Sequence, residues 1–257
     1  MQCKSVNAGD VKIVYHTAGD GDSPAICLLP STGRSGRDFH ELCNYLTGHG
    51  FKVILPEPRG IGGSVGPMAG IDFHDLAADA VAAIRAETNK VIIAGHAFGC
   101  WLARTVAADY PDLVSGLVLI AAGSGKWPSE LSEAINTLAS AHASREERLA
   151  ALSLAFFTPS SNSEPWLEGW HSDVIATQRA ARASTDRESW WHSGRAPILD
   201  LVGLQDPFRP ASSRNDFVRE FKDRVSLVTI DGASHALPDE KPEEVAEEIS
   251  KWSKTIL

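Results

Sequence analysis

The sequence predicts an α/β fold in which a mostly parallel sheet carries helices on both faces. Two observations favour this class: short apolar runs alternate with longer amphipathic segments, and most of the apolar runs are bounded by Gly or Pro. Strand and helix in repetition build a parallel sheet that is covered on both sides. The 257 residues suit one sizeable domain with a continuous core, so two independent domains are not expected.

The strands and helices of this sheet can be placed in order along the chain. Buried strands are expected at residues 25–29, 51–55, 91–94, 117–121, 198–202 and 225–230. Between and after them, apolar residues recur at helical spacing over residues 38–48, 73–88, 98–110, 214–222 and 242–252. The alternation of Val11, Ile13 and Tyr15 ahead of a turn at Gly19 to Gly21 predicts an opening hairpin.

Composition and charge narrow the classes of function. Hydrophobic residues make up 43% and charged residues 22% of the chain, which excludes a disordered or collagen-like protein. The formal net charge is −9 and no cluster of Lys and Arg occurs, so a nucleic-acid or anionic-membrane partner has no electrostatic support. Neither a metal-ligand motif nor a dinucleotide loop is present. We therefore expect a small-molecule substrate and no cofactor or metal.

The cellular location and oligomeric state follow from weaker signals. No apolar run approaches the roughly 18 residues of a membrane helix, and Met1 to Asp10 lack the basic and apolar regions of a signal peptide. A cytoplasmic protein without a membrane partner is expected, as a monomer or a homodimer.

The alternation of strands and helices breaks once. Residues 123–195 contain no expected strand and hold most of the tryptophans, which predicts a helical cap inserted into a core of residues 1–122 and 196–257. A cap between parallel strands grows from the carboxyl edge of the sheet, where ligands bind. Its aromatic residues predict an apolar or aromatic substrate. The aromatic residues of this segment that can supply stacking walls are Trp127, Phe156, Phe157, Trp166, Trp170, Trp190 and Trp191. The candidates for substrate contact among them are Trp127, Phe157, Trp166, Trp170 and Trp191.

The sequence Gly95-His96-Ala97-Phe98-Gly99 follows one strand and opens the next helix. Glycine at both ends permits a strained strand-to-helix turn that aims the middle side chain into a site. The segment resembles the G-x-S-x-G nucleophile elbow of the α/β-hydrolase superfamily, with Ala97 at the position of the serine. The resemblance extends from the hairpin to the last helix. It implies an eight-stranded sheet with a cap, and hydrolysis of a small carbonyl compound: an ester, lactone, amide or carbon–carbon bond.

Two late loops look like the acid and histidine loops of the same superfamily. Gly203-Leu204-Gln205-Asp206-Pro207 follows the penultimate strand and Gly232-Ala233-Ser234-His235 follows the last one. The resemblance implies that His235 is the base and Asp206 the acid: an imidazole takes and returns a proton, and a carboxylate fixes its tautomer. Asp200 is the less favoured acid because it lies inside a strand.

The oxyanion hole of the superfamily consists of backbone N–H groups, which assigns it here to Phe98 and Thr32. The loop that carries Thr32 reads Pro30-Ser31-Thr32-Gly33 where the superfamily usually has His-Gly. Ser31 is therefore a further candidate for substrate contact, or for a hydroxyl near His235. A further segment, Pro56 to Ser64, is similar to the D-x-R-G-x-G-x-S loop of the superfamily, and its glycines and Arg59 are interpreted as structural.

Alanine at position 97 excludes an acyl-enzyme through this residue, because a methyl group cannot attack a carbonyl. Three explanations stay open. A serine was replaced deliberately in an esterase-like hydrolase; or Ala97 is native, and His235 with Asp206 acts on water or abstracts a substrate proton, as in a lyase or cofactorless oxygenase; or the fold serves as a non-catalytic receptor. The intact acid and histidine loops argue against the receptor, and the departure at Ser31 favours a native alanine.

Overall fold

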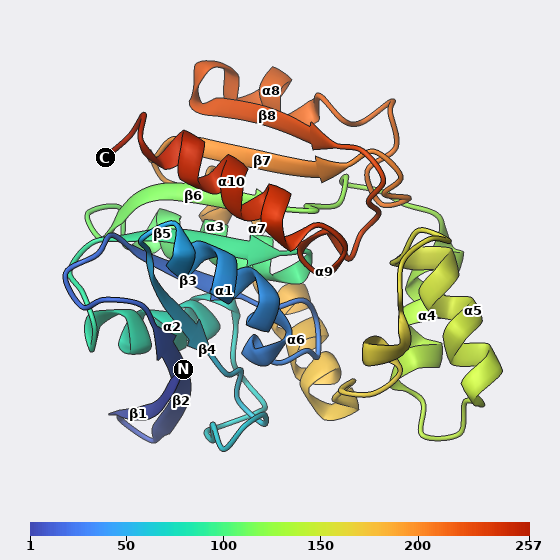
Figure 1. The fold of residues 1–257 in the computed structure, drawn as a ribbon. Helices are drawn as coiled ribbons and strands as arrows, with labels where there is room; N and C mark the ends of the chain where they lie inside the picture. The colour runs from blue at the N-terminus through green and yellow to red at the C-terminus, as the bar shows by residue number, and fades with distance from the viewer.

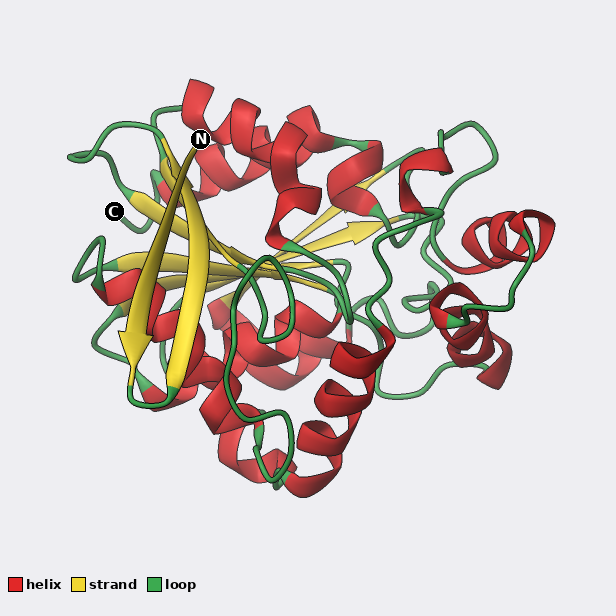
Figure 2. Ribbon diagram, turned by 90° about the horizontal axis from the view of Figure 1, so that it is seen from below, coloured by secondary structure: helices red, strands yellow, loops and turns green.

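The computed structural model describes residues 1–257 and has the expected α/β architecture, with an eight-stranded sheet between two helical layers (Figure 1; Figure 2). The strand order is β1-β2-β4-β3-β5-β6-β7-β8. Only the β1–β2 and β2–β4 pairs are antiparallel. The strands are β1 (Gln2–Ala8), β2 (Val11–Ala18), β3 (Ala25–Leu29), β4 (Lys52–Pro56), β5 (Val91–His96), β6 (Val114–Ile120), β7 (Ile198–Gly203) and β8 (Val225–Ile230).

Helices cover both faces of the sheet because successive side chains of each strand point to opposite sides. Along β3, Cys27 and Leu29 enter one core with side chains of α2 and α3, whereas Ile26 and Leu28 enter the other with α1 and α10. No helix is both long and apolar enough to cross a membrane. The helices are α1 (His40–Gly48), α2 (Phe73–Arg85), α3 (Phe98–Asp109), α4 (Ser129–Ala139), α5 (Arg145–Ala155), α6 (Ser172–Ser184), α7 (Arg187–Trp190), α8 (Asp216–Phe221), α9 (Leu237–Glu240) and α10 (Pro242–Ser253), with short 3-10 turns at Gly36–Phe39, Glu164–Trp166 and Lys222–Arg224.

The opening hairpin differs from the expected one. Its strands are β1 and β2, and they are joined at Gly9 and Asp10, where Gly9 has a φ of 66°. The expected turn at Gly19 to Gly21 instead leads from β2 to β3, and β2 pairs with β4 on its other side. The sequence of β1 gave no signal for a strand because its side chains lie at an exposed edge and are mostly polar.

The segment between β6 and β7 contains helices α4 to α7 and no strand. Figure 1 shows α4 and α5 apart from the sheet, at one end of the molecule. These two helices share a separate apolar cluster that also contains Phe156, Trp166 and Phe208. The helices lie where a cap over residues 123–195 would place them, and the division into core and cap stays a prediction.

Candidate active site

The strand-to-helix turn at Ala97 is held in a strained conformation. Ala97 has φ 51° and ψ −110°, a combination that costs a non-glycine residue about 1–3 kcal/mol. A Cβ atom on Gly95 would lie 2.1 Å from the Gly99 oxygen, and one on Gly99 would lie 2.1 Å from the Leu29 oxygen. Both glycines are therefore needed for the helix to pack this close to β3 and β5. Strain of this kind, kept by the surrounding packing, is typical of functional sites.

The acid and histidine loops are tied to each other and to this turn. The N–H of Gln205 donates to the Ala233 oxygen, and the N–H of Ala233 donates to the Gln205 side chain, both at 3.0 Å. His96 Nε2–H donates to the backbone oxygen of His235 at 2.7 Å. Burial lowers the pKa of His96 to about 3, so this ring is neutral and acts as a donor that fixes the histidine loop.

His235 and Asp206 form a buried pair. The Nδ1 atom of His235 lies 2.9 Å from Asp206 Oδ2, and the other carboxylate oxygen accepts the N–H of Phe208 at 2.8 Å. The imidazole packs against two aromatic rings, with centroid distances of 4.1 Å to Phe208 and 5.6 Å to Phe156. Because Asp206 engages Nδ1, the Nε2 atom is the one free to accept a proton in the adjoining cavity.

A cavity of about 250 Å³ brings the site together. Its volume is below the roughly 300–1,000 Å³ of drug-sized sites, so the ligand is small. His235 and Ala97 line it, together with residues of the core loops, of α4 and of α6. The full lining is Ser31, Thr32, Ala97, Phe98, Trp101, Gly123, Trp127, Ser132, Ile135, Phe156, Gln178, Arg179, Arg182, Phe208 and His235.

The two expected oxyanion donors, Thr32 and Phe98, both line this cavity. Phe98 is the first residue of α3, so its N–H has no acceptor within the helix. Helix α6 fixes the loop of Thr32, because Gln178 Oε1 accepts the Thr32 hydroxyl at 3.0 Å and the Gly33 N–H at 2.9 Å. Gly33 has φ 62°, and a Cβ atom there would lie 2.3 Å from Ile175 of α6.

The structure brings only part of the predicted substrate-contact set to the cavity. Ser31 and Trp127 line it, whereas Phe157, Trp166, Trp170 and Trp191 do not. Trp166 is buried under α9 and donates its indole N–H to Asp239, and Phe157 packs edge-on against it. Trp170 and Trp191 also form contacts outside the cavity.

Those two tryptophans lie in the packing around the cavity rather than on its wall. Trp170 donates to the Trp166 oxygen at 2.7 Å. Trp191 packs against Trp190 and the ring of Phe217, and Arg104 lies over its face. Trp170 thus packs within the segment between β6 and β7, and Trp191 ties that segment to α3 and α8.

Two aromatic residues on the cavity wall, Trp101 and Phe208, are not among the site residues predicted from the sequence. Trp101 lies one helical turn after Ala97 on α3, a spacing that places both on the same face, and it stacks on Trp127. Phe208 follows Asp206 by two residues. Of the adjacent residues Phe156 and Phe157, which both pack against Trp166, only Phe156 lines the cavity. The helical spacing of Trp101 from the elbow is the signal that identifies it in the sequence.

Two other charged residues of the sequence analysis have structural partners. Arg59 donates to both carboxylate oxygens of Asp79, a buried contact that ties its loop to α2. Asp200 is fully buried and bound to Arg209 at 2.8 Å. It does not line the cavity. The structure has no group of three or more His, Cys, Asp or Glu side chains placed to hold a metal ion.

Comparison with known proteins identifies the family. The model of the alpha/beta hydrolase family matches residues 28–248. The chain belongs to this family. The prediction of an α/β-hydrolase fold is thereby confirmed, and the enzyme class is confirmed at the level of the family.

Individual relatives are distant. A pyrrolizixenacetamide deacetylase of Xenorhabdus hominickii is 31% identical over 121 residues, which are 46% of this chain and 44% of that protein. The match thus spans less than half of the deacetylase. A 2-(acetamidomethylene)succinate hydrolase of Mesorhizobium japonicum is 26% identical over 85% of this chain and 73% of its own length. The solved structure of a hydrolase from Pseudomonas aeruginosa has a TM-score of 0.80 at 20% identity and covers 98% of both chains, which shows the shared fold.

Proposed function

We propose that this chain hydrolyses a small apolar or aromatic carbonyl compound, an ester, lactone, amide or activated carbon–carbon bond, with water as the nucleophile. The observation that carries the proposal is the placement of His235 in one cavity with Ala97 and the two oxyanion donors. The methyl group of Ala97 leaves the position of a serine oxygen to a water molecule. In this proposal Ala97 is the native residue and makes room for the nucleophilic water. The competing explanation is that a native serine was replaced by alanine through engineering.

The reaction follows from the geometry in two steps. His235 Nε2 takes a proton from the water as the water oxygen bonds to the carbonyl carbon, while Asp206 stabilises the imidazolium through Nδ1. The carbonyl oxygen becomes an oxyanion and accepts the N–H groups of Thr32 and Phe98. Collapse of this intermediate breaks the bond to the leaving group, which receives the proton from Nε2.

Several observations support an enzyme over a receptor. The strained turn at Ala97, the buried His235–Asp206 pair and the free N–H groups at one end of the cavity are costly features that binding alone does not require. The relatives carry the names of a deacetylase and a hydrolase. The imidazole of His235 is buried and packs against the tilted rings of Phe208 and Phe156, so the base lies in a site from which most water is excluded.

The expected rate is modest. Loss of the serine from a complete triad costs roughly 10⁶ in kcat. A general base acting on water recovers about 10² to 10⁴ of this loss. The Ala97→Ser variant, which restores the serine, is therefore expected to exceed the wild type by about 10² to 10⁴ in kcat.

The experiment compares the wild type, Ala97→Ser and His235→Ala on aryl and alkyl esters, with release of the alcohol as the readout. The proposal expects slow turnover by the wild type, a large gain in Ala97→Ser and turnover at background in His235→Ala. Wild-type turnover equal to that of His235→Ala would refute it. No gain in Ala97→Ser, with a different product formed by the wild type, would favour proton abstraction instead. Binding without turnover in all three would favour a receptor.

A further inference from the structure

Two arginines line the cavity without a partner of opposite charge. Arg179 and Arg182 lie three residues apart on α6, so they share one face of the helix. Neither forms an ion pair or a hydrogen bond with the protein. By contrast, the surface arginine Arg195 is paired with Asp112. Unpaired guanidinium groups at an otherwise mostly apolar cavity are free to bind an anion.

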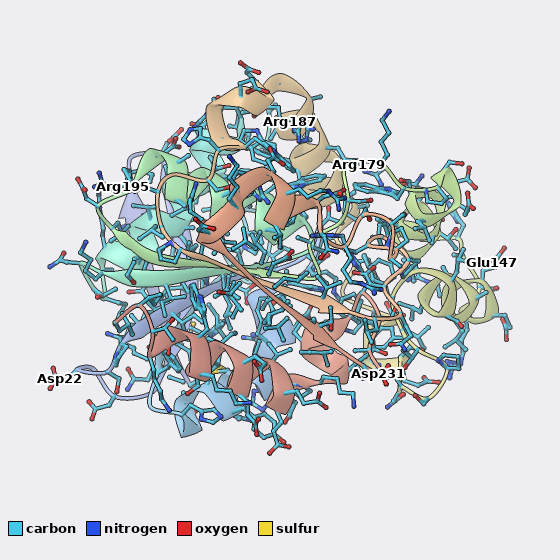
Figure 3. The ribbon with its side chains drawn as sticks, turned by 90° about the horizontal axis from the view of Figure 1, so that it is seen from above. Asp22, Glu147, Arg179, Arg187, Arg195 and Asp231 are labelled. Atoms are coloured by element: carbon cyan, nitrogen blue, oxygen red, sulfur yellow. The ribbon has the colours of Figure 1, made fainter.

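The surroundings of Arg182 hold its charge at the wall of the cavity. Its guanidinium carbon lies 5.4 Å from the ring centroid of Trp101 and 5.6 Å from that of Trp190. Such cation–π contacts orient a guanidinium without neutralising it. Arg182 is half-buried, whereas Arg179 is exposed and lies between the ribbons of α6 and the α4–α5 pair in Figure 3.

Helix α6 also fixes the distance between these charges and the reaction centre. Gln178, next to Arg179 in sequence, accepts the Thr32 hydroxyl and the Gly33 N–H. The same turn of the helix therefore positions an oxyanion donor and presents a guanidinium. A substrate whose carbonyl oxygen binds to the Thr32 N–H is held in a defined register relative to Arg179 and Arg182.

We propose that the cavity selects carbonyl compounds that carry a carboxylate, bound by Arg182 and Arg179. The planar guanidinium matches a carboxylate through paired hydrogen bonds. The chain carries a net charge of −9, so its overall field repels anions and any preference for them must come from these local charges. The small volume of about 250 Å³ favours a carboxylate over the bulkier phosphate. The inference rests on the proposed function for the reaction, but binding of the carboxylate can be measured independently of hydrolysis.

Binding is measured first, by the fluorescence of Trp101 and Trp127 in the cavity wall. The probes are phenylpropanoate, its neutral isostere phenylpropanamide, and phenylethyl phosphate. The wild type is expected to bind phenylpropanoate about tenfold more tightly than phenylpropanamide, since one of the two guanidinium groups is exposed and screened. The preference should shrink as the salt concentration rises.

Variants assign the preference to the two arginines. The double change Arg179→Gln and Arg182→Gln removes the preference. Arg182→Lys weakens it, because an ammonium group cannot form the paired hydrogen bonds, and the matched surface control Arg195→Gln leaves it unchanged. Equal binding of acid and amide by the wild type, binding of neither, or equal weakening of both probes by the double change would overturn the proposal. Tighter binding of phenylethyl phosphate than of phenylpropanoate would also contradict the carboxylate.

Turnover separates this inference from the proposed function. Monophenyl glutarate carries a carboxylate, and phenyl valerate is its neutral analogue. A carboxylate preference in binding without hydrolysis of either ester refutes the proposed function and leaves the anion site standing. Hydrolysis of both esters with equal kcat/KM refutes the anion site and leaves the proposed function standing.

Discussion

Replacing Asp206 by asparagine tests how His235 is oriented. The carboxylate accepts from His235 Nδ1 at 2.9 Å and from the Phe208 N–H at 2.8 Å. An amide can keep the second bond through its oxygen, but then its NH₂ group faces Nδ1. The imidazole must present a lone pair there and carry its proton on Nε2, which then cannot act as a base. The rings of Phe208 and Phe156 offer Nδ1 no other acceptor.

The expected loss in kcat is about 10² to 10⁴ in the wild type, which is the whole contribution of the general base, and about 10⁴ in Ala97→Ser, the magnitude of a wrong tautomer in a serine triad. Hydrolysis of an aryl ester is measured in the wild type and again in an Ala97→Ser background, where the signal is larger. The free energy of unfolding in urea should change by less than about 2 kcal/mol, since one neutral hydrogen bond is kept. In a His235→Ala background, Asp206→Asn should cause no further loss, because the two residues act as a unit. Retention of more than a tenth of the activity by Asp206→Asn would refute this orientation.

Two further predictions concern stability. Burial raises the pKa of Asp239 to about 7, so the folded state holds a proton that the unfolded state releases and the free energy of unfolding falls as pH rises from about 4 to about 7. In urea unfolding, Asp239→Asn should therefore raise the free energy of unfolding more at about pH 8 than at about pH 5. An equal increase at both pH values would contradict this prediction. Gly99→Ala should lower the free energy of unfolding by about 3 kcal/mol, since its Cβ would lie 2.1 Å from the Leu29 oxygen, whereas Gly21→Ala, which meets nothing within 4 Å, should be neutral. Equal urea midpoints of unfolding for the two glycine variants would contradict the close packing of Gly99 against the Leu29 oxygen.

The sheet was predictable because its strands are buried on both faces. A segment such as Ala25 to Leu29 is apolar at every position and is buried throughout. The edge strand β1 was not predictable, since its residues Gln2 to Ala8 are stabilised by pairing with β2 rather than by burial. Backbone hydrogen bonds do not require an alternation of apolar and polar residues, so the sequence of β1 does not show one.

The candidate site divides in a similar way. Ala97, Asp206 and His235 follow the ends of strands, and chain order alone brings such positions to one edge of a parallel sheet. The cavity wall depends instead on how the helices between β6 and β7 pack. Phe156 and Phe157 are adjacent and both pack against Trp166, and the sequence does not determine which of them lines the cavity. Arg179 and Arg182 could not be predicted as site residues for the same reason, because only packing shows which face of α6 meets the site.

The central claim is that water, activated by His235, is the nucleophile in this chain. Intact mass spectrometry during turnover of an activated aryl ester tests it most directly. The wild type should release the alcohol while its mass stays that of the free chain at every time point, whereas Ala97→Ser should accumulate one acyl group at position 97. An acyl adduct on the wild-type chain during turnover, at Ser31 or any other side chain, would contradict the claim.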